Sequence, residues 1–218
     1  RNVMRYYHRN YPWYQFGIDL ALGSGIDYPI NLREQAFAPA LLAEQLQGAT
    51  AGGRPLVSHI EEVNPQYTDA TAGPTPWLLS PMCVSVLLLA ITLIVTRRDI
   101  RRMRVSRRFD TVLFGIFGLA GCLLTFLIFI SVHEATSPNF LYMWLNPLCL
   151  IPVIFIWIKK CKKLVLCYHF TNFALVFAMA ACWPWLPQSA NAAFIPLILC
   201  DLTRSASYIY ITNFKRKQ

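Results

Sequence analysis

The sequence predicts an all-α membrane protein, in which a five-helix transmembrane bundle follows the C-terminal remnant of an α-rich (α+β) domain outside the membrane. Apolar stretches of nearly membrane-spanning length fill the chain after Trp77, and the loops between them differ sharply in charge. In addition, 56% of the residues are hydrophobic and only 14% are charged, which is typical of a protein that crosses the membrane several times.

The apolar stretches also set the predicted domain boundaries. We expect residues 1–63 to form the outer domain, residues 64–76 a linker rich in Thr, Ala, Gly and Pro, and residues 77–218 the transmembrane domain. Pro147 and Pro152 lie within the third stretch, so this helix either kinks or begins at Pro147 after a re-entrant segment. The predicted spans cover approximately residues 77–95, 109–132, 140–158, 164–182 and 194–212.

The charges of the loops orient the spans. Every second connection is basic, whereas the connections at residues 132–139 and 183–193 contain no Lys or Arg. Because Lys and Arg stay on the cytoplasmic side, the N-terminal segment is predicted outside and the C-terminus inside. The basic residues are Arg97, Arg98, Arg101, Arg102, Arg104, Arg107 and Arg108 in the first loop, Lys159, Lys160, Lys162 and Lys163 in the next, and Lys215, Arg216 and Lys217 in the tail.

The outer segment shows helical patterns and one clear helix start. Residues 2–9 and 13–22 are predicted to be helical, with a break at Pro12. Asn31 is predicted to cap a further helix, with Glu34 completing a capping box. Residues 56–63 are predicted to be a short strand or an extended segment. Because this outer segment has no signal peptide or preceding span, we expect the chain to be the C-terminal portion of a longer protein.

Composition and spacing exclude several classes of function. The net charge of +9 comes from the basic loops and tail, so it does not indicate nucleic-acid binding. No Cys-x-x-Cys or Cys/His spacing indicates a metal site, and no motif predicts a cofactor. The cysteines all fall in or beside apolar spans, where we expect them to be small buried hydrophobic residues. They are Cys83, Cys122, Cys149, Cys161, Cys167, Cys182 and Cys200.

Asp201 and Arg204 are the charged residues predicted within a span, where each costs roughly 2.5–3.5 kcal/mol at the helix centre. They are three positions apart, so we expect them to pair on one helix face. His169 and Asn172 of the preceding span are expected at a similar depth if the two helices are antiparallel. This polar seam is either a salt bridge that fixes helix packing or the floor of a lipid-binding cavity.

The outer loop between the second and third spans carries a second candidate site. His133, Glu134 and Asn139 place an imidazole, a carboxylate and an amide at the predicted membrane surface, and Asn146 follows. These groups could orient or deprotonate a substrate in acyl chemistry on a lipid headgroup. Alternatively, they only cap helices at the interface.

Two runs near the start of the chain form a specific pattern. They are Asn10-Tyr11-Pro12-Trp13-Tyr14-Gln15-Phe16-Gly17-Ile18-Asp19-Leu20-Ala21-Leu22-Gly23, then Asp27, then Leu32-Arg33-Glu34-Gln35-Ala36-Phe37-Ala38-Pro39 with Leu42. They resemble the C-terminal part of the periplasmic domain of the Lnb-type lipoprotein N-acyltransferases of the Bacteroides group. The basic loop and the segment from His133 to Pro147 are also similar to that family, and the resemblance covers nearly the whole chain.

The resemblance implies a thiol-dependent enzyme that takes an acyl chain from membrane phospholipid. The acyl chain passes through a thioester to the amine of the N-terminal cysteine of a lipoprotein, and the thioester divides the transfer into two easier steps. The family's catalytic cysteine and its partner histidine are expected upstream of Arg1. The resemblance therefore implies that this chain contains no catalytic residue and is inactive alone. It also implies a multi-pass protein of the bacterial inner membrane with a periplasmic N-terminal segment.

A second class of function stays open. The chain could be a non-catalytic envelope protein whose helices anchor a periplasmic binding or scaffolding domain. A transporter or channel is disfavoured, because only one intramembrane charged pair is predicted and the spans show no internal symmetry.

Overall fold

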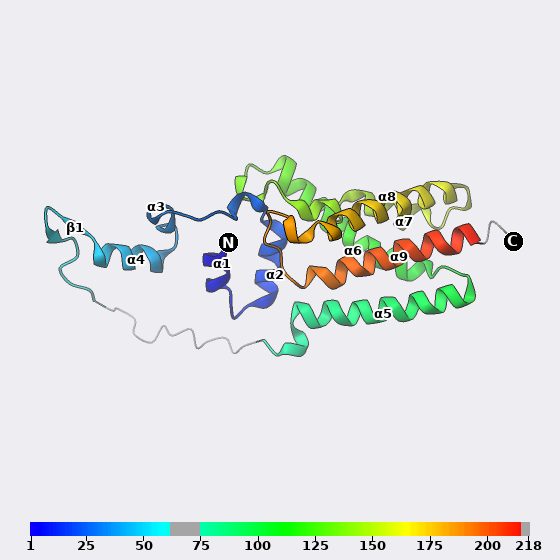
Figure 1. Ribbon diagram of the computed structural model, residues 1–218, viewed down its shortest axis with the longest axis horizontal. Helices are drawn as coiled ribbons and strands as arrows, with labels where there is room; N and C mark the ends of the chain where they lie inside the picture. Colours follow the sequence, from blue (N-terminus) through cyan, green and yellow to red (C-terminus); the bar gives the residue numbers. More distant parts are fainter. Residues whose placement is uncertain (62–74, 215–218) are drawn as a thin grey trace.

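A computed structural model describes residues 1–61 and 75–214. The N-terminal part is made of short helices, which in Figure 1 occupy one end of an elongated molecule. Helices α1 and α2 lie against the end of the bundle, whereas α3 and α4 extend away from it (Figure 1). Most of the predicted linker, residues 64–74, lies outside the described residues. These helices are α1 (Asn2–Tyr7), α2 (Pro12–Ala21), α3 (Leu32–Gln35) and α4 (Pro39–Gly48), with a 3-10 turn η1 (Ser24–Ile26) after α2.

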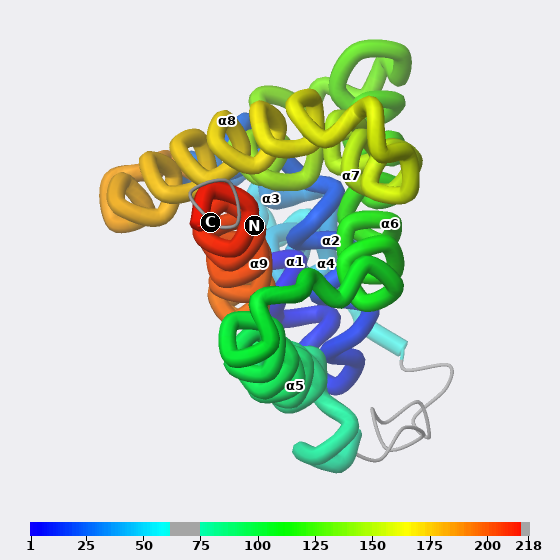
Figure 2. Tube along the Cα trace, turned by 90° about the vertical axis from the view of Figure 1, so that its right-hand side faces the viewer, coloured from blue at the N-terminus to red at the C-terminus, as the bar shows by residue number. Residues whose placement is uncertain are grey.

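The bundle contains the four longest helices of the described residues together with the short α7. Viewed end-on in Figure 2, the helices are arranged around the long axis in the order α5, α9, α8, α7, α6. Each helix in this order packs against the next one. The helices are α5 (Pro81–Arg102), α6 (Arg107–Thr125), α7 (Leu150–Phe155), α8 (Lys162–Ala181) and α9 (Phe194–Phe214).

The two ends of the bundle differ in charge. The loops 103–106 and 156–161 and the C-terminus of α9 lie at one end, which we call the basic end (Figure 1). The loops 131–139 and 182–193 lie at the other end, beside α1 and α2, and we call this the neutral end (Figure 1).

Among the described residues, three helices are long and apolar enough to cross a membrane, namely residues 107–130, 159–181 and 194–214. The α5 helix is 22 residues long and carries no charged side chain from Pro81 to Thr96. Large apolar side chains on the helix surfaces are exposed, such as Ile116 at 60% and Leu119 at 67%. A surface of this kind fits a protein whose helices face lipid.

Residues 140–158 do not form the continuous helix that the third predicted span requires. They form 3-10 turns η6 (Phe140–Met143) and η7 (Pro147–Cys149), followed by the six-residue α7. Asn146 caps η7, since its side-chain oxygen accepts from the Leu148 backbone N–H at 3.1 Å. Helical structure begins at Pro147 with the 3-10 turn η7, and the α-helix follows from Leu150, which agrees with the helix start of one sequence-based alternative. Whether the residues before Pro147 re-enter the membrane stays a prediction.

Local signals set several element boundaries. The capping box at α3 is confirmed, because Asn31 Oδ1 accepts from Glu34 N at 2.9 Å and Glu34 Oε2 accepts from Asn31 N at 2.8 Å. The strands lie earlier than predicted, at β1 (Thr50–Ala51) and β2 (Arg54–Pro55). The hairpin turn between them uses Gly52 and Gly53, which both have positive φ and therefore favour a tight two-residue turn.

The bundle core is rich in aromatic side chains. Trp144 is fully buried and packs edge-on against Phe117 with ring centroids 5.2 Å apart. Its ring also lies 6.4 Å from that of Phe194 on α9. Trp144 therefore belongs to the core, whereas Trp77 and Trp185 are exposed at 71% and 79%. Burial of Trp144 joins the irregular segment before α7 to α6 and α9.

Candidate functional site

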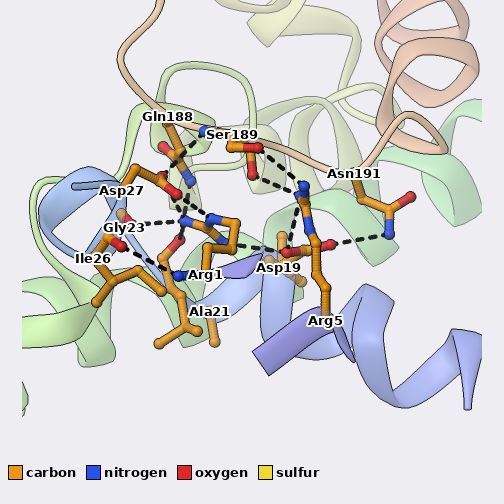
Figure 3. Close-up of polar contacts among 12 residues, drawn as sticks. Arg1, Arg5, Asp19, Ala21, Gly23, Ile26, Asp27, Gln188, Ser189 and Asn191 are labelled. Atoms are coloured by element: carbon orange, nitrogen blue, oxygen red, sulfur yellow. Dashed lines mark hydrogen bonds and ion pairs between the residues drawn. The ribbon is translucent and has the colours of Figure 1, made fainter. Parts of the chain in front are cut away.

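The N-terminal segment is held on the neutral end by a network of polar contacts, most of them partly buried, which we call the latch (Figure 3). The latch joins the C-terminal end of α2 and η1 to the loops 131–139 and 182–193. Its side chains come from parts of the sequence more than 100 residues apart. The residues of the latch are Arg1, Arg5, Asp19, Asp27, Asn139, Gln188, Ser189 and Asn191.

Arg1 lies at the centre of the latch, with its side chain only 2% exposed. Its guanidinium donates to both carboxylate oxygens of Asp27, at 2.6 and 2.9 Å, and to Asp19 at 3.2 Å. The remaining donors reach the backbone carbonyls of Leu22 at 3.1 Å and Gly23 at 2.7 Å. A buried guanidinium is tolerated only when its charge and donors are matched in this way.

Asp19 balances the charges of the latch. Its side chain is 1% exposed and accepts from Arg1 and, at 3.3 Å, from Arg5. The latch therefore contains two arginines and two aspartates, so no net charge is buried. Asn191 of the second loop donates to the other Asp19 oxygen at 3.2 Å. This contact ties α2 to the segment that leads into α9.

Ser189 adds a further connection between the N-terminal segment and the second loop. Its backbone N–H donates to Asp27 at 3.1 Å. Its carbonyl and hydroxyl accept from Arg5 at 2.9 and 3.0 Å. Both aspartates of the latch thus bond to the 182–193 loop.

Two amide side chains link both loops to α2. Asn139 donates to the Leu20 carbonyl at 2.9 Å, and Gln188 donates to the Leu22 carbonyl at 3.1 Å. Gln188 also donates to Asn139 Oδ1 at 3.0 Å and accepts from the Phe140 backbone N–H at 2.6 Å. Because both amides are buried, each bond replaces one that water would otherwise make.

Gly23 allows the backbone of the N-terminal segment to touch the 131–139 loop. Its N–H donates to the Ala135 carbonyl at 2.9 Å, and the Ser24 N–H donates to the Pro138 carbonyl at 2.7 Å. A Cβ atom at Gly23 would lie 2.5 Å from that Pro138 oxygen. Any larger residue at this position would therefore push the two backbones apart.

The structure separates the residues that the sequence groups in the first outer loop. His133 is exposed, and its Nδ1 lies 2.6 Å from Ser131 Oγ. Glu134 is exposed beside a cleft of about 490 Å³ that lies between η1, α3 and this loop. Asn139 instead faces the latch, and all of its polar atoms bond to protein groups. Asn146 lies in the bundle, where it caps η7.

The residues of the predicted polar seam are buried in the bundle, but Asp201 and Arg204 have different partners from those predicted. Arg204 does not bond to Asp201. It donates instead to Asp110 at 2.6 and 3.1 Å, to Asp99 at 2.9 Å and to Thr96 at 2.9 Å. The guanidinium reaches past its own helix to α5 and α6, whose ends approach α9 near the basic end.

Asp201 belongs to a separate cluster between α8 and α9. Its Oδ1 accepts from Asn172 at 2.5 Å and from Ser205 at 3.2 Å. His169 Nδ1 lies 3.2 Å from the Ser205 hydroxyl oxygen, and its ring stacks on Tyr208 with centroids 4.3 Å apart. His169 and Asn172 on α8 therefore do lie beside the polar residues of α9. Their partners there are Asp201 and Ser205, and not Arg204.

The latch is the site that the sequence does not predict. One signal is available in the sequence, since Asp19 interrupts the apolar face of the predicted helix 13–22.

No group of three or more His, Cys, Asp or Glu side chains suited to a metal occurs in the part of the chain that the structure describes.

Comparison with known proteins identifies a family. A family model described as the Lnb transmembrane domain matches residues 74–217, which is more than half of the chain. No curated protein matches, and neither does any solved structure.

Proposed function

The chain belongs to the family of the Lnb transmembrane domain, and from this we propose that it is the membrane and distal periplasmic part of a lipoprotein N-acyltransferase. The proposed reaction passes an acyl chain from a membrane phospholipid to the N-terminal cysteine amine of a lipoprotein. It proceeds through a thioester on a cysteine that belongs to the sequence preceding Arg1. A thioester divides the transfer into two steps, each with a good nucleophile or leaving group.

The proposed placement is a five-span protein of the bacterial inner membrane, with the neutral end in the periplasm. The contrast between the basic and neutral ends supports this orientation, because Lys and Arg favour the cytoplasmic side. The length of α5 supports a span there. The irregular segment 140–158 supplies the remaining crossing in this proposal, and it packs against α6 and α8.

The latch is the observation that carries the proposal. Both substrates of such an enzyme, a phospholipid and a membrane-anchored lipoprotein, present their reacting groups at the membrane surface. The latch holds α2 and η1 directly against the neutral loops, so a domain continuous with them is fixed at that surface. Fixed placement of this kind lowers the entropic cost of bringing the reacting groups together.

The cleft beside the latch is the proposed place for part of a substrate. It is lined mainly by apolar side chains of the N-terminal segment, with Glu134 and Ala135 contributed by the 131–139 loop. Its volume of about 490 Å³ suits a segment of an acyl chain or a short peptide. Glu134 is the exposed carboxylate of this loop that lines the cleft, where it would contact a headgroup or an amine, and the exposed His133 precedes it outside the lining.

Cysteine placement supports a nucleophile outside this sequence. The cysteines all lie after residue 77, in the bundle or at its ends. None lies in the segment that the latch fixes at the neutral end. We therefore propose that residues 1–218 supply the anchor and the acyl-chain platform, and that they are inactive alone.

The test uses cells that lack the complete gene. Mass spectrometry of the lipoprotein N-termini should find free amines in these cells and acylated amines after the intact gene is restored. Unchanged N-terminal acylation in the deletion strain would reject the enzyme and leave an anchoring role for a periplasmic scaffold. A His133→Ala variant then tests the loop, with reduced acylation expected if His133 contacts substrate.

A further inference from the structure

A second cavity opens at the basic end of the bundle, opposite the latch. Its volume is about 950 Å³, and residues from the ends of α5, α6, α8 and α9 line it together with the segment after α7. The basic end of the bundle faces the viewer in Figure 2. Nothing in the proposed acyl transfer uses this end of the molecule.

The rim of this cavity is strongly cationic. Six basic side chains line it, and no carboxylate lies within ion-pairing distance of five of them among residues 1–61 and 75–214. The nearby carboxylates of Asp99 and Asp110 are already bonded to Arg204, which leaves one negative charge against six positive ones. The six are Arg98, Arg104, Arg107, Arg108, Lys159 and Lys162, of which Arg98 lies 4.0 Å from Asp99.

Two long helices also begin at this cavity. The first turns of α6, at Arg107, and of α8, at Lys162, contribute residues to the lining. Neither helix has a side-chain cap, so backbone N–H groups of their first turns have no side-chain partner. The positive ends of both helix dipoles therefore add to the side-chain charges and favour an anion.

The inner wall of the cavity is apolar. Phe155 and Ile156 come from the end of α7, and Ile211 lies on the inner face of α9. Trp157 is half exposed at the mouth. A small soluble anion would leave this wall in contact with water, whereas an anion joined to hydrocarbon would cover it.

We propose that this cavity binds an anionic phospholipid, with the phosphate between Arg104, Arg107 and Lys159 and the first part of an acyl chain against Phe155 and Ile211. Basic pockets between transmembrane helices are suited to anionic headgroups. The inference rests on placement of the bundle in a membrane and not on acyl transfer, so each can fail without the other.

The test measures lipid binding to the purified complete protein in detergent by native mass spectrometry. Dioleoyl phosphatidylglycerol should bind with higher affinity than zwitterionic dioleoyl phosphatidylcholine. The site variant Arg104→Gln/Arg107→Gln/Lys159→Gln should lose at least about tenfold in phosphatidylglycerol affinity. The control Arg97→Gln/Arg101→Gln/Arg102→Gln removes the same charge from exposed residues that do not line the cavity, and it should bind as the wild type does.

Equal losses in the two variants would overturn the proposal, since they would indicate general attraction to the basic end. Displacement of the lipid by an equal concentration of glycerol 3-phosphate would also overturn it, because the site would then recognise phosphate alone. If the site variant does not fold, the test is photo-crosslinking of the wild-type protein. The probe is a phosphatidylglycerol that carries a diazirine in its acyl chain. Adducts should fall on residues 155–158 or 208–212, and adducts confined to the outer surface of α6 would refute the site.

Discussion

Replacement of Arg204 by methionine should destabilise the bundle more than any other single change in the polar seam. The guanidinium is 1% exposed and makes four hydrogen bonds, three of them to the carboxylates of Asp99 and Asp110. Methionine fills a similar volume but leaves the Asp110 carboxylate buried without a cation and Asp99 with only Arg98, 4.0 Å away. Breaking one buried pair in this way costs about 3–5 kcal/mol, and we expect the upper end of that range here.

The assay is equilibrium unfolding of the purified protein in mixed micelles, followed by tryptophan fluorescence and fitted for the free energy of unfolding. A triple variant, Asp99→Asn/Asp110→Asn/Arg204→Met, serves as the control because it removes all three charges together. It should recover most of the loss, since neutral amides carry a much smaller desolvation cost than carboxylates. A loss below about 1 kcal/mol for Arg204→Met, or no recovery in the triple variant, would refute the ion cluster as described.

Two further predictions concern the other polar contacts. Asp201→Asn should change the free energy of unfolding by less than about 1 kcal/mol in the same titration, because the Asn172 and Ser205 bonds can persist and no cation pairs with Asp201 among the described residues. A loss as large as that of Arg204→Met would contradict this difference. Gly23→Ala should speed protease cleavage of the N-terminal segment at least severalfold, because its methyl group meets the Pro138 carbonyl. Gly17→Ala, whose Cβ would meet nothing within 4 Å, should leave the cleavage rate unchanged, and equal rates in the two variants would argue against close contact at Gly23.

Local patterns predict much of the helical structure. Pro12 begins α2 and the pair Asn31 and Glu34 begins α3, because caps and prolines act through residues a few positions away. The resemblance to the Lnb family, stated on the runs from Asn10 to Leu42 and on the later loops, is confirmed for the transmembrane part by the family match over residues 74–217.

The pairing of charges cannot be predicted in the same way. Spacing of three residues favours a bond between Asp201 and Arg204, but it ignores partners on other helices. Asp99 and Asp110 stand beside the basic loop in the sequence, where they resemble loop residues. In the folded bundle both carboxylates lie next to α9, and the long Arg204 side chain donates hydrogen bonds to both.

The latch escapes sequence-based prediction for a related reason. Arg1 and Asp27 are 26 positions apart, and Leu22 bonds to a residue 166 positions away. No periodicity or short motif encodes contacts at such separations. The sequence leaves open whether Asn139 contacts a substrate or caps a helix. In the structure its oxygen accepts from the Leu141 N–H at the start of η6, and only the docked position of α2 shows that its amide N–H donates to the Leu20 carbonyl. Whether His133 and Glu134 contact a substrate stays a prediction.

The most direct test of the proposed role of the latch is N-terminal acylation of lipoproteins in cells whose only copy of the complete gene carries Asn139→Ala and Gln188→Ala. The two bonds to the Leu20 and Leu22 carbonyls contribute roughly 1 kcal/mol each, so their loss shifts docking of the N-terminal segment by about thirtyfold. We predict a clear rise in free amines by mass spectrometry at wild-type protein levels, with no rise for the exposed control Gln47→Ala. Full acylation by the double variant would contradict the claim that the latch positions the reaction.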